Sequence, residues 1–183
     1  VMTTVFFYMI TAYTPTYGNK VLQLTAEASL TVTMCVGLLN FVLLPTMGAV
    51  SDKLGRIPLL VGASVIALII GYPMMNWLVD APSFARLMTV QLTFAVVYAT
   101  YNGAMIVFLT EIMPAKVRTA GFSLAYSLAT ALFGGFTPAI ATYLIGQTGD
   151  RAIPGAWLSV AAVIGLLATL SFAFKRAPKP VAA

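Results

Sequence analysis

The sequence has no histidine, a single cysteine and very little charge. Only 8% of its 183 residues are charged, and the lone cysteine is Cys35. An internal disulfide and a Cys/His metal site are therefore both excluded. There is also no nucleophile–base pair and no phosphate-binding glycine loop of the kind that marks an enzyme. We expect no metal, no cofactor and no catalytic centre.

What the sequence has in their place is hydrophobic side chains. They make up 60% of the chain, and the mean hydropathy is +0.95. A soluble domain is about 45–50% apolar and about 25% charged, so this chain lacks the charge to cover a water-facing surface. The ten basic residues are scattered through connections and form no patch for nucleic acid. The composition predicts an integral membrane protein that contacts the lipid bilayer and binds no nucleic acid.

Charged and Pro/Gly-rich breaks divide the chain into apolar stretches near the 20 residues that a spanning helix needs. The six expected spans are residues 1–17, 28–50, 57–79, 84–110, 117–145 and 154–174. Their apolar runs are continuous, which favours helices over the alternating strands of a barrel. The first stretch does not resemble a signal peptide and starts abruptly, as if cut from a longer chain. We expect an all-α, polytopic bundle over residues 1–174 and a basic tail over 175–183.

The basic residues are divided unevenly between alternate connections. Seven lie in the second connection, the fourth connection and the tail, and three lie in the first, third and fifth connections. Short loops rich in Lys and Arg stay in the cytoplasm. The C-terminus is therefore expected in the cytoplasm, and with an even number of spans so is the N-terminal end.

Polar side chains follow one face in the first, second, fourth and fifth stretches, whereas the third and sixth are almost bare. Polar groups in a bilayer face the bundle interior or a wet cavity. The order is two lining helices followed by one outer helix, and this three-helix unit occurs twice. Such a repeat is typical of transporters. The residues expected to face the cavity are Tyr8, Tyr13, Asn40, Tyr98, Tyr101, Asn102, Ser123 and Tyr126. Hydroxyl and glycine stripes also mark ordinary helix packing, and for the fifth stretch that alternative stays open.

The second connection carries the pattern G-x-x-x-D-x-x-G-R between Gly48 and Arg56. Gly48 would let two helices approach closely, and Gly55 would permit the backbone reversal. Asp52 could cap the next helix or pair with Arg56. These features predict a tight turn between two spans.

The fourth connection carries the pattern E-x-x-P-x-x-x-R-x-x-G from Glu111 to Gly121. Glu111 and Arg118 would stand at the cytoplasmic ends of successive helices. Together with Asp52 and Arg56 they could form a charge cluster that holds one conformation of a carrier. We expect these residues to act in gating and not in substrate binding.

Both connections resemble signature loops of the major facilitator superfamily. The runs TAYTPTYG over 11–18 and YNGAM over 101–105 look like its metabolite:proton symporter branch. The stretch 111–140 is most similar to citrate–proton symporters, and tricarballylate carriers match almost as well. The likeness covers essentially the whole chain, but only the C-terminal six-helix half of that fold. It implies symport of a citrate-like anion with H+ through the inner membrane, by alternating access against an N-terminal six-helix half.

The chain departs from a complete carrier in one respect, because no ionisable residue lies deep inside any expected span. A tri-anion in a low-dielectric cavity needs cationic partners, and proton coupling usually needs a titratable group. We therefore expect the missing half to carry both. A carrier of tricarballylate, of a dicarboxylate or of another organic anion stays open as an alternative, and so does a truncated membrane fragment that transports nothing.

Overall fold

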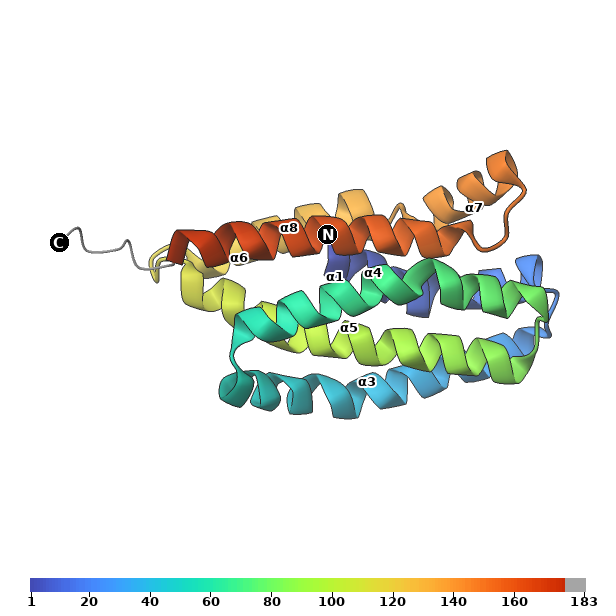
Figure 1. The fold of residues 1–183 in the computed structure, drawn as a ribbon, viewed down its shortest axis with the longest axis horizontal. Helices are drawn as coiled ribbons and strands as arrows, with labels where there is room; N and C mark the ends of the chain where they lie inside the picture. The colour runs from blue at the N-terminus through green and yellow to red at the C-terminus, as the bar shows by residue number, and fades with distance from the viewer. Residues whose placement is uncertain (177–183) are drawn as a thin grey trace.

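The described part of the chain is helical almost throughout. The computed structural model describes residues 1–176, with side chains up to residue 173, and contains no strand in that range (Figure 1). The all-α fold class is therefore confirmed. The last helix, α8 (Ile153–Arg176), includes the start of the basic tail predicted over 175–183, and the rest of that tail lies outside the described residues.

Five helices in the described range are long and apolar enough to cross a membrane, which identifies a multi-pass membrane protein. They are α3 (Ala26–Leu54), α4 (Arg56–Asp80), α5 (Phe84–Ile112), the combined helix Arg118–Thr148, and the Ile153–Ala173 part of α8. The combined helix consists of α6 (Arg118–Ala129), the π-helical segment η3 (Thr130–Gly134) and α7 (Thr137–Thr148). Each begins and ends within a few residues of the stretch expected from the sequence.

The first expected span is also helical, but it is built differently. It consists of α1 (Met2–Tyr8), η1 (Met9–Tyr13), α2 (Thr14–Thr16) and η2 (Tyr17–Val21), so α-helical and π-helical turns alternate. This segment is not among the five helices that meet the length and hydropathy of a span. Figure 1 shows that it starts near the middle of the bundle and runs to one end. Its crossing of the membrane stays a prediction.

Helix ends follow signals in the local sequence. Thr25 caps α3 by accepting a hydrogen bond from the backbone N of Ala28 at 3.2 Å, and Ser83 caps α5 by accepting one from Arg86 N at 3.2 Å. Gly55 separates α3 from α4 with a φ of +90°, which a residue with a side chain rarely adopts. This is the reversal expected at that position, and it sets α4 antiparallel to α3.

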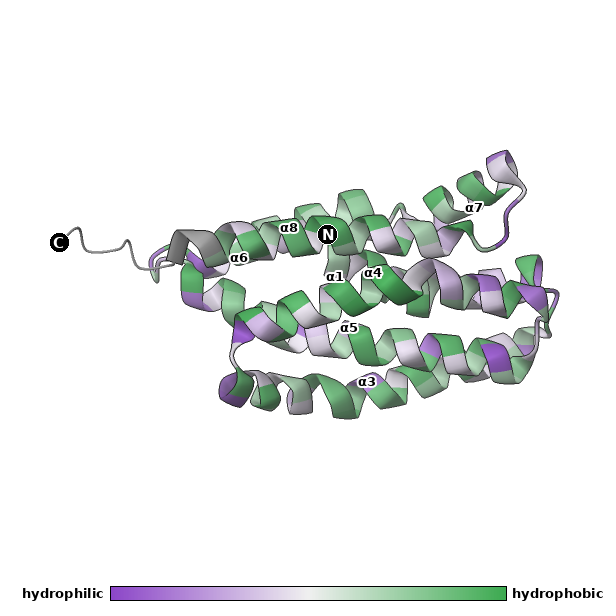
Figure 2. Ribbon diagram, in the orientation of Figure 1, coloured by the Kyte–Doolittle hydropathy of each residue, from purple (hydrophilic) through white to green (hydrophobic). Residues whose placement is uncertain are grey.

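The centre of the bundle is α5, which packs along α3 on one side and α4 on the other. α4 in turn packs along α8, and the two helices share one side of the molecule (Figure 1). Apolar side chains of α4 and α8 remain exposed. The colouring of Figure 2 shows that both helices consist largely of hydrophobic residues. Such a surface is suited to lipid, in keeping with the supporting role expected of these two helices.

Glycine sets the closest helix contacts. A Cβ on Gly155 of α8 would meet the carbonyl oxygen of Gly71 and lie 2.8 Å from the Cα of Tyr72 on α4. A Cβ on Gly103 of α5 would lie 2.9 Å from the backbone N of Gly48 on α3, whereas a Cβ on Gly48 would meet nothing within 4 Å. The prediction that Gly48 itself permits the close approach is therefore corrected. Gly103 is the residue without room for a side chain, because it faces the α3 backbone.

Candidate substrate-binding site

Several of the predicted cavity residues gather where α1, α5 and α6 meet. The Asn102 Nδ2 donates to the Tyr98 phenol oxygen at 3.2 Å across one turn of α5. The Tyr98 ring lies 5.9 Å from that of Phe7, which lies 5.7 Å from the ring of Tyr8. Tyr126 of α6 is close enough to interact electrostatically with both Tyr98 and Tyr8. The structure thus brings Tyr8, Tyr98, Asn102 and Tyr126 into one aromatic and amide cluster.

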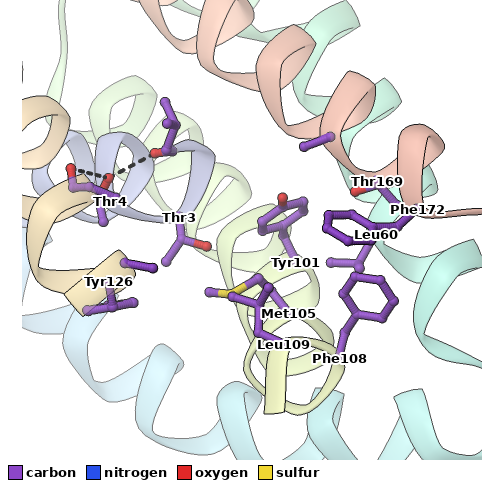
Figure 3. A pocket seen from close by; sticks show the side chains of 14 residues that line it. Thr3, Thr4, Leu60, Tyr101, Met105, Phe108, Leu109, Tyr126, Thr169 and Phe172 are labelled. Carbon is purple, nitrogen blue, oxygen red and sulfur yellow. Dashed lines mark hydrogen bonds between the residues drawn. The ribbon is translucent and has the colours of Figure 1, made fainter. Parts of the chain in front are cut away.

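A cavity of about 220 Å³ lies beside this cluster, and two of the predicted residues, Tyr101 and Tyr126, line it. Tyr8, Tyr98 and Asn102 are not among the residues that line it. Figure 3 shows Tyr126 on one side of the cavity and Tyr101, next to Thr169, on the other. Thr3 and Thr4 of α1 also line it, and the Thr4 hydroxyl bonds to the Val1 and Ala129 carbonyl oxygens at 2.9 and 3.4 Å. No charged side chain is among the lining residues. The site can donate hydrogen bonds to a carboxylate, but it supplies no compensating positive charge.

The remaining predicted cavity residues lie elsewhere. The Tyr13 phenol forms a 3.2 Å hydrogen bond with the Thr142 hydroxyl and so joins η1 to α7. Asn40 is buried on α3, and its Oδ1 has no hydrogen-bond partner within the described residues. Ser123 is exposed on α6. None of these three lines the cavity, and their proposed contact with substrate stays a prediction.

A second cluster, which we call the Arg56 cluster, ties three helices together at one end of the bundle. The Arg56 guanidinium lies 2.6 Å from Asp52 Oδ1 and 3.0 Å from Glu111 Oε1, so α3, α4 and α5 meet there. It also donates to the Ser51 hydroxyl at 2.9 Å. Arg118 does not join the cluster, because its guanidinium donates to the Met113 carbonyl oxygen of its own loop at 3.4 Å. The expected four-residue charge cluster therefore contains three of its members.

At the opposite end of the bundle, hydrogen bonds from tyrosine hydroxyls join the helices. The Tyr17 hydroxyl donates to the Arg151 carbonyl oxygen at 2.7 Å, and the Tyr72 hydroxyl donates to Asp150 Oδ2 at 3.0 Å. Asp150 Oδ1 accepts from the backbone N of Ala152 at 2.8 Å. These bonds fix the connection between α7 and α8 against the first helical segment and α4.

A model of the "Sugar (and other) transporter" family matches residues 1–179. The chain belongs to this family. Citrate-proton symporters of Salmonella typhi and Klebsiella pneumoniae are each 56% identical to it over 168 residues, or 92% of the chain. A putative proline/betaine transporter of Staphylococcus aureus (strain COL) is 30% identical over 87% of the chain. The chain spans only 39%, 38% and 34% of these relatives' own lengths. No solved structure matches.

Sequence reasoning missed the hydroxyl that α8, which it treated as an outer support, contributes to the cavity. Thr169 belongs to α8 and is buried in the cavity wall. The signal that points to it is Gly165, four residues earlier on the same face, where a Cβ would lie 3.1 Å from the Tyr101 hydroxyl oxygen. A small residue followed one turn later by a hydroxyl marks the part of α8 that faces the cavity.

Proposed function

We propose that this chain forms the C-terminal six-helix half of a proton-coupled symporter for a tricarboxylate, with citrate as the first candidate. The observation that carries the proposal is the 56% identity to two citrate-proton symporters across 92% of the chain. The proposed substrate contacts are the phenols of Tyr101 and Tyr126, which line the cavity, together with Tyr98 and Asn102 of the adjoining cluster. Phenol O–H and amide N–H groups donate hydrogen bonds to a carboxylate. The phenol and amide oxygens can also accept a hydrogen bond from a protonated carboxyl.

The second partner in this proposal is an N-terminal six-helix half. It would supply the intramembrane Arg or Lys and the proton-handling carboxylate, because the cavity has no charged side chain of its own. The surface available for it is an apolar stripe on α3 that comprises Leu30, Met34, Leu38 and Phe41, of which Phe41 is 82% exposed. These residues are spaced three or four apart, so they form one continuous face of the helix.

The proposed orientation places the Arg56 cluster in the cytoplasm. Figure 1 shows the α3–α4 turn, the α5–α6 connection and the C-terminal end of α8 at the same end of the bundle. These are the basic-rich connections, which stay inside by the positive-inside rule. Asp52, Arg56 and Glu111, near Gly48 and Gly55, would then hold one conformation of an inner-membrane carrier. Arg118 would act only through its own loop.

The test is uptake of radiolabelled citrate by cells that express the full-length protein, compared with the 183-residue chain alone. Tyr101→Phe removes a hydroxyl from the cavity wall, and Asn102→Ala removes an amide from the adjoining cluster. Each should raise KM by roughly tenfold, as expected for a lost hydrogen bond to a charged group. Tyr143→Phe is the matched control, because Tyr143 is exposed on α7 and lies outside the cavity. Normal uptake by both variants would refute their assignment.

Each alternative function predicts a different result in the uptake assay. Unlabelled tricarballylate that displaces citrate equally well would place this protein among carriers that ignore the central hydroxyl. Absence of uptake by the full-length protein, with normal membrane insertion, would leave only the interpretation of a fragment that transports nothing. Uptake that persists after the pH gradient is abolished would remove the proton from the mechanism.

A further inference from the structure

The cavity is lined by hydroxyl groups and apolar side chains, with no charged side chain among the described residues that line it. The hydroxyls belong to Thr3, Thr4, Tyr101, Tyr126 and Thr169. In such surroundings an ionised carboxylate is costly to bury, and a carboxyl group is more stable with its proton bound. The direction in which each hydroxyl points its single proton therefore decides which form of a carboxyl group the cavity can hold.

On the α8 side, the proton of the Thr169 hydroxyl is already used. It is donated to the Gly165 carbonyl oxygen at 2.8 Å, one turn earlier in the same helix. Thr169 stands next to Tyr101, and the two side chains interact through their hydroxyl groups (Figure 3). A hydroxyl has one proton and two lone pairs, so Thr169 offers Tyr101 only an acceptor. The Tyr101 proton then points to Thr169, and a lone pair of the phenol oxygen is left for the cavity.

The position of the Tyr101 phenol is fixed by the same turn of α8. A Cβ on Gly165 would lie 3.1 Å from the Tyr101 hydroxyl oxygen and 3.0 Å from the Cβ of Met2. The phenol oxygen therefore lies directly against α8, where a larger residue than glycine would displace it. Gly165 and Thr169 together set both the place and the orientation of this hydroxyl.

The α1 side of the cavity supplies a free donor. The Thr4 proton is committed to the Val1 or Ala129 carbonyl oxygen. Thr3 differs, because it is only 4% exposed and its Oγ1 has no hydrogen-bond partner within the described residues. Figure 3 shows the Thr3 oxygen pointing into the cavity. A buried hydroxyl without a partner is unfavourable unless a ligand or water satisfies it.

We propose that the cavity binds one carboxyl group of the substrate in its protonated, neutral form. The carboxyl O–H donates to the Tyr101 oxygen, and the carboxyl C=O accepts from the Thr3 hydroxyl. A carboxylate has no proton to donate, so it would meet the lone pair of Tyr101 with no positive charge nearby to offset the repulsion. Thr169 acts as a positioning residue, because it reaches the substrate only through Tyr101.

This inference rests on the proposed transport function, because it assigns the protonation state of the substrate at the same site. One proton enters on the substrate and leaves with it, in addition to any proton that the missing half holds. The other carboxylates of the substrate stay ionised and face the cations expected in that half.

The experiment is calorimetric binding to the full-length protein in lipid nanodiscs, without a pH gradient and in buffers of different ionisation enthalpy. The ligands are citrate and a citrate monoamide, whose neutral amide offers an N–H donor and a C=O acceptor as a protonated carboxyl does. Above neutral pH, citrate should take up about one proton more than the monoamide on binding. Its Kd should rise more steeply with pH, by a further factor of up to about ten per pH unit.

Variants of the hydroxyl pair test the proposed orientation. Thr169→Val removes the acceptor for the Tyr101 proton, so it should weaken monoamide binding by about three- to tenfold and reduce the extra proton uptake with citrate. Thr169→Ser keeps the hydroxyl and should restore both. In a Tyr101→Phe background, Thr169→Val should have no further effect. Thr89→Val is the matched control, because Thr89 makes the same one-turn bond, to the Ala85 carbonyl oxygen at 2.9 Å, outside the cavity.

The proposal is overturned if citrate and the monoamide bind with the same proton uptake and the same pH dependence, a comparison that needs no variant to fold. It is also overturned if the monoamide fails to bind where citrate binds, or if Thr169→Val and Thr89→Val have equal effects. Failure of the proposed function gives a different pattern, in which neither ligand binds to the correctly inserted protein, and this inference then fails with it.

Discussion

α5 and the α6–α7 helix follow one another in the chain, span 29 and 31 residues, and have opposite surroundings. α5 lies between α3 and α4 and buries most of the side chains that line its core face, whereas α6 buries none. The cavity between them therefore has a closely packed wall that carries Tyr101 and a more exposed wall that carries Tyr126. Membrane helices of similar hydropathy thus divide into a packed pillar and an exposed wall according to their contacts within the described chain.

The strongest test of this contrast is truncation of a buried ring on α5. Phe94 is fully buried and its ring meets that of Phe6 edge-on, at 6.0 Å. Phe94→Ala should lower the free energy of unfolding by about 3–5 kcal/mol, through lost burial and the cavity left behind. Leu124→Ala on α6 should change it by less than about 0.5 kcal/mol. Denaturant unfolding in detergent micelles measures both, and similar losses would end the distinction between pillar and wall.

Substitution of one glycine on each helix should also destabilise α5 more than α6, by a smaller amount. Gly103→Val on α5 places a side chain against the α3 backbone and should destabilise the protein by about 1–3 kcal/mol, as overpacking does. On α6, a Cβ at Gly121 would meet only the Met113 Sδ, at 3.6 Å. Gly121→Val should therefore leave the melting temperature nearly unchanged. A loss as large as that for Gly103→Val would show that α6 is packed more tightly than its burial indicates.

The smallest expected effect concerns the end of α5. Glu111→Gln removes one partner of Arg56 and should slow citrate turnover by less than about fivefold, because exposed ion pairs are weak. The substrate KM should stay the same, since Glu111 lies outside the cavity. Arg118→Gln, at the start of α6, should have less effect still. Equal slowing by the two variants would bring Arg118 back into the gating cluster.

The helices could be predicted from the sequence because a run of about 20 apolar residues has few alternatives in a bilayer. The helical face of each polar residue was also readable, and Tyr98 and Asn102 do bond to each other across one turn of α5. Periodicity, however, relates a residue to its own helix and not to its neighbours. Tyr13 was expected to face the cavity together with Tyr8, and yet its phenol bonds to Thr142.

The loop motifs show the same limit at shorter range. Asp52 and Arg56 are four residues apart across the turn at Gly55, so their pairing follows from the short connection between α3 and α4. Glu111 joins them because α5 ends beside the point where α4 begins, and Arg118 donates to the Met113 carbonyl oxygen of its own loop. Likewise the G-x-x-x-D motif contains Gly48, but the contact that tolerates no side chain belongs to Gly103 on the neighbouring helix.

The sequence by itself determined that this protein is a bundle of membrane helices, how long each one is and where the tight turn at Gly55 falls. These properties depend on hydropathy and on the backbone freedom of single residues, which are local. Only the tertiary structure decided that α5 is the pillar and that α8 contributes Thr169 to the cavity. These properties depend on which helices pack together, and packing partners are set by contacts between residues far apart in the chain.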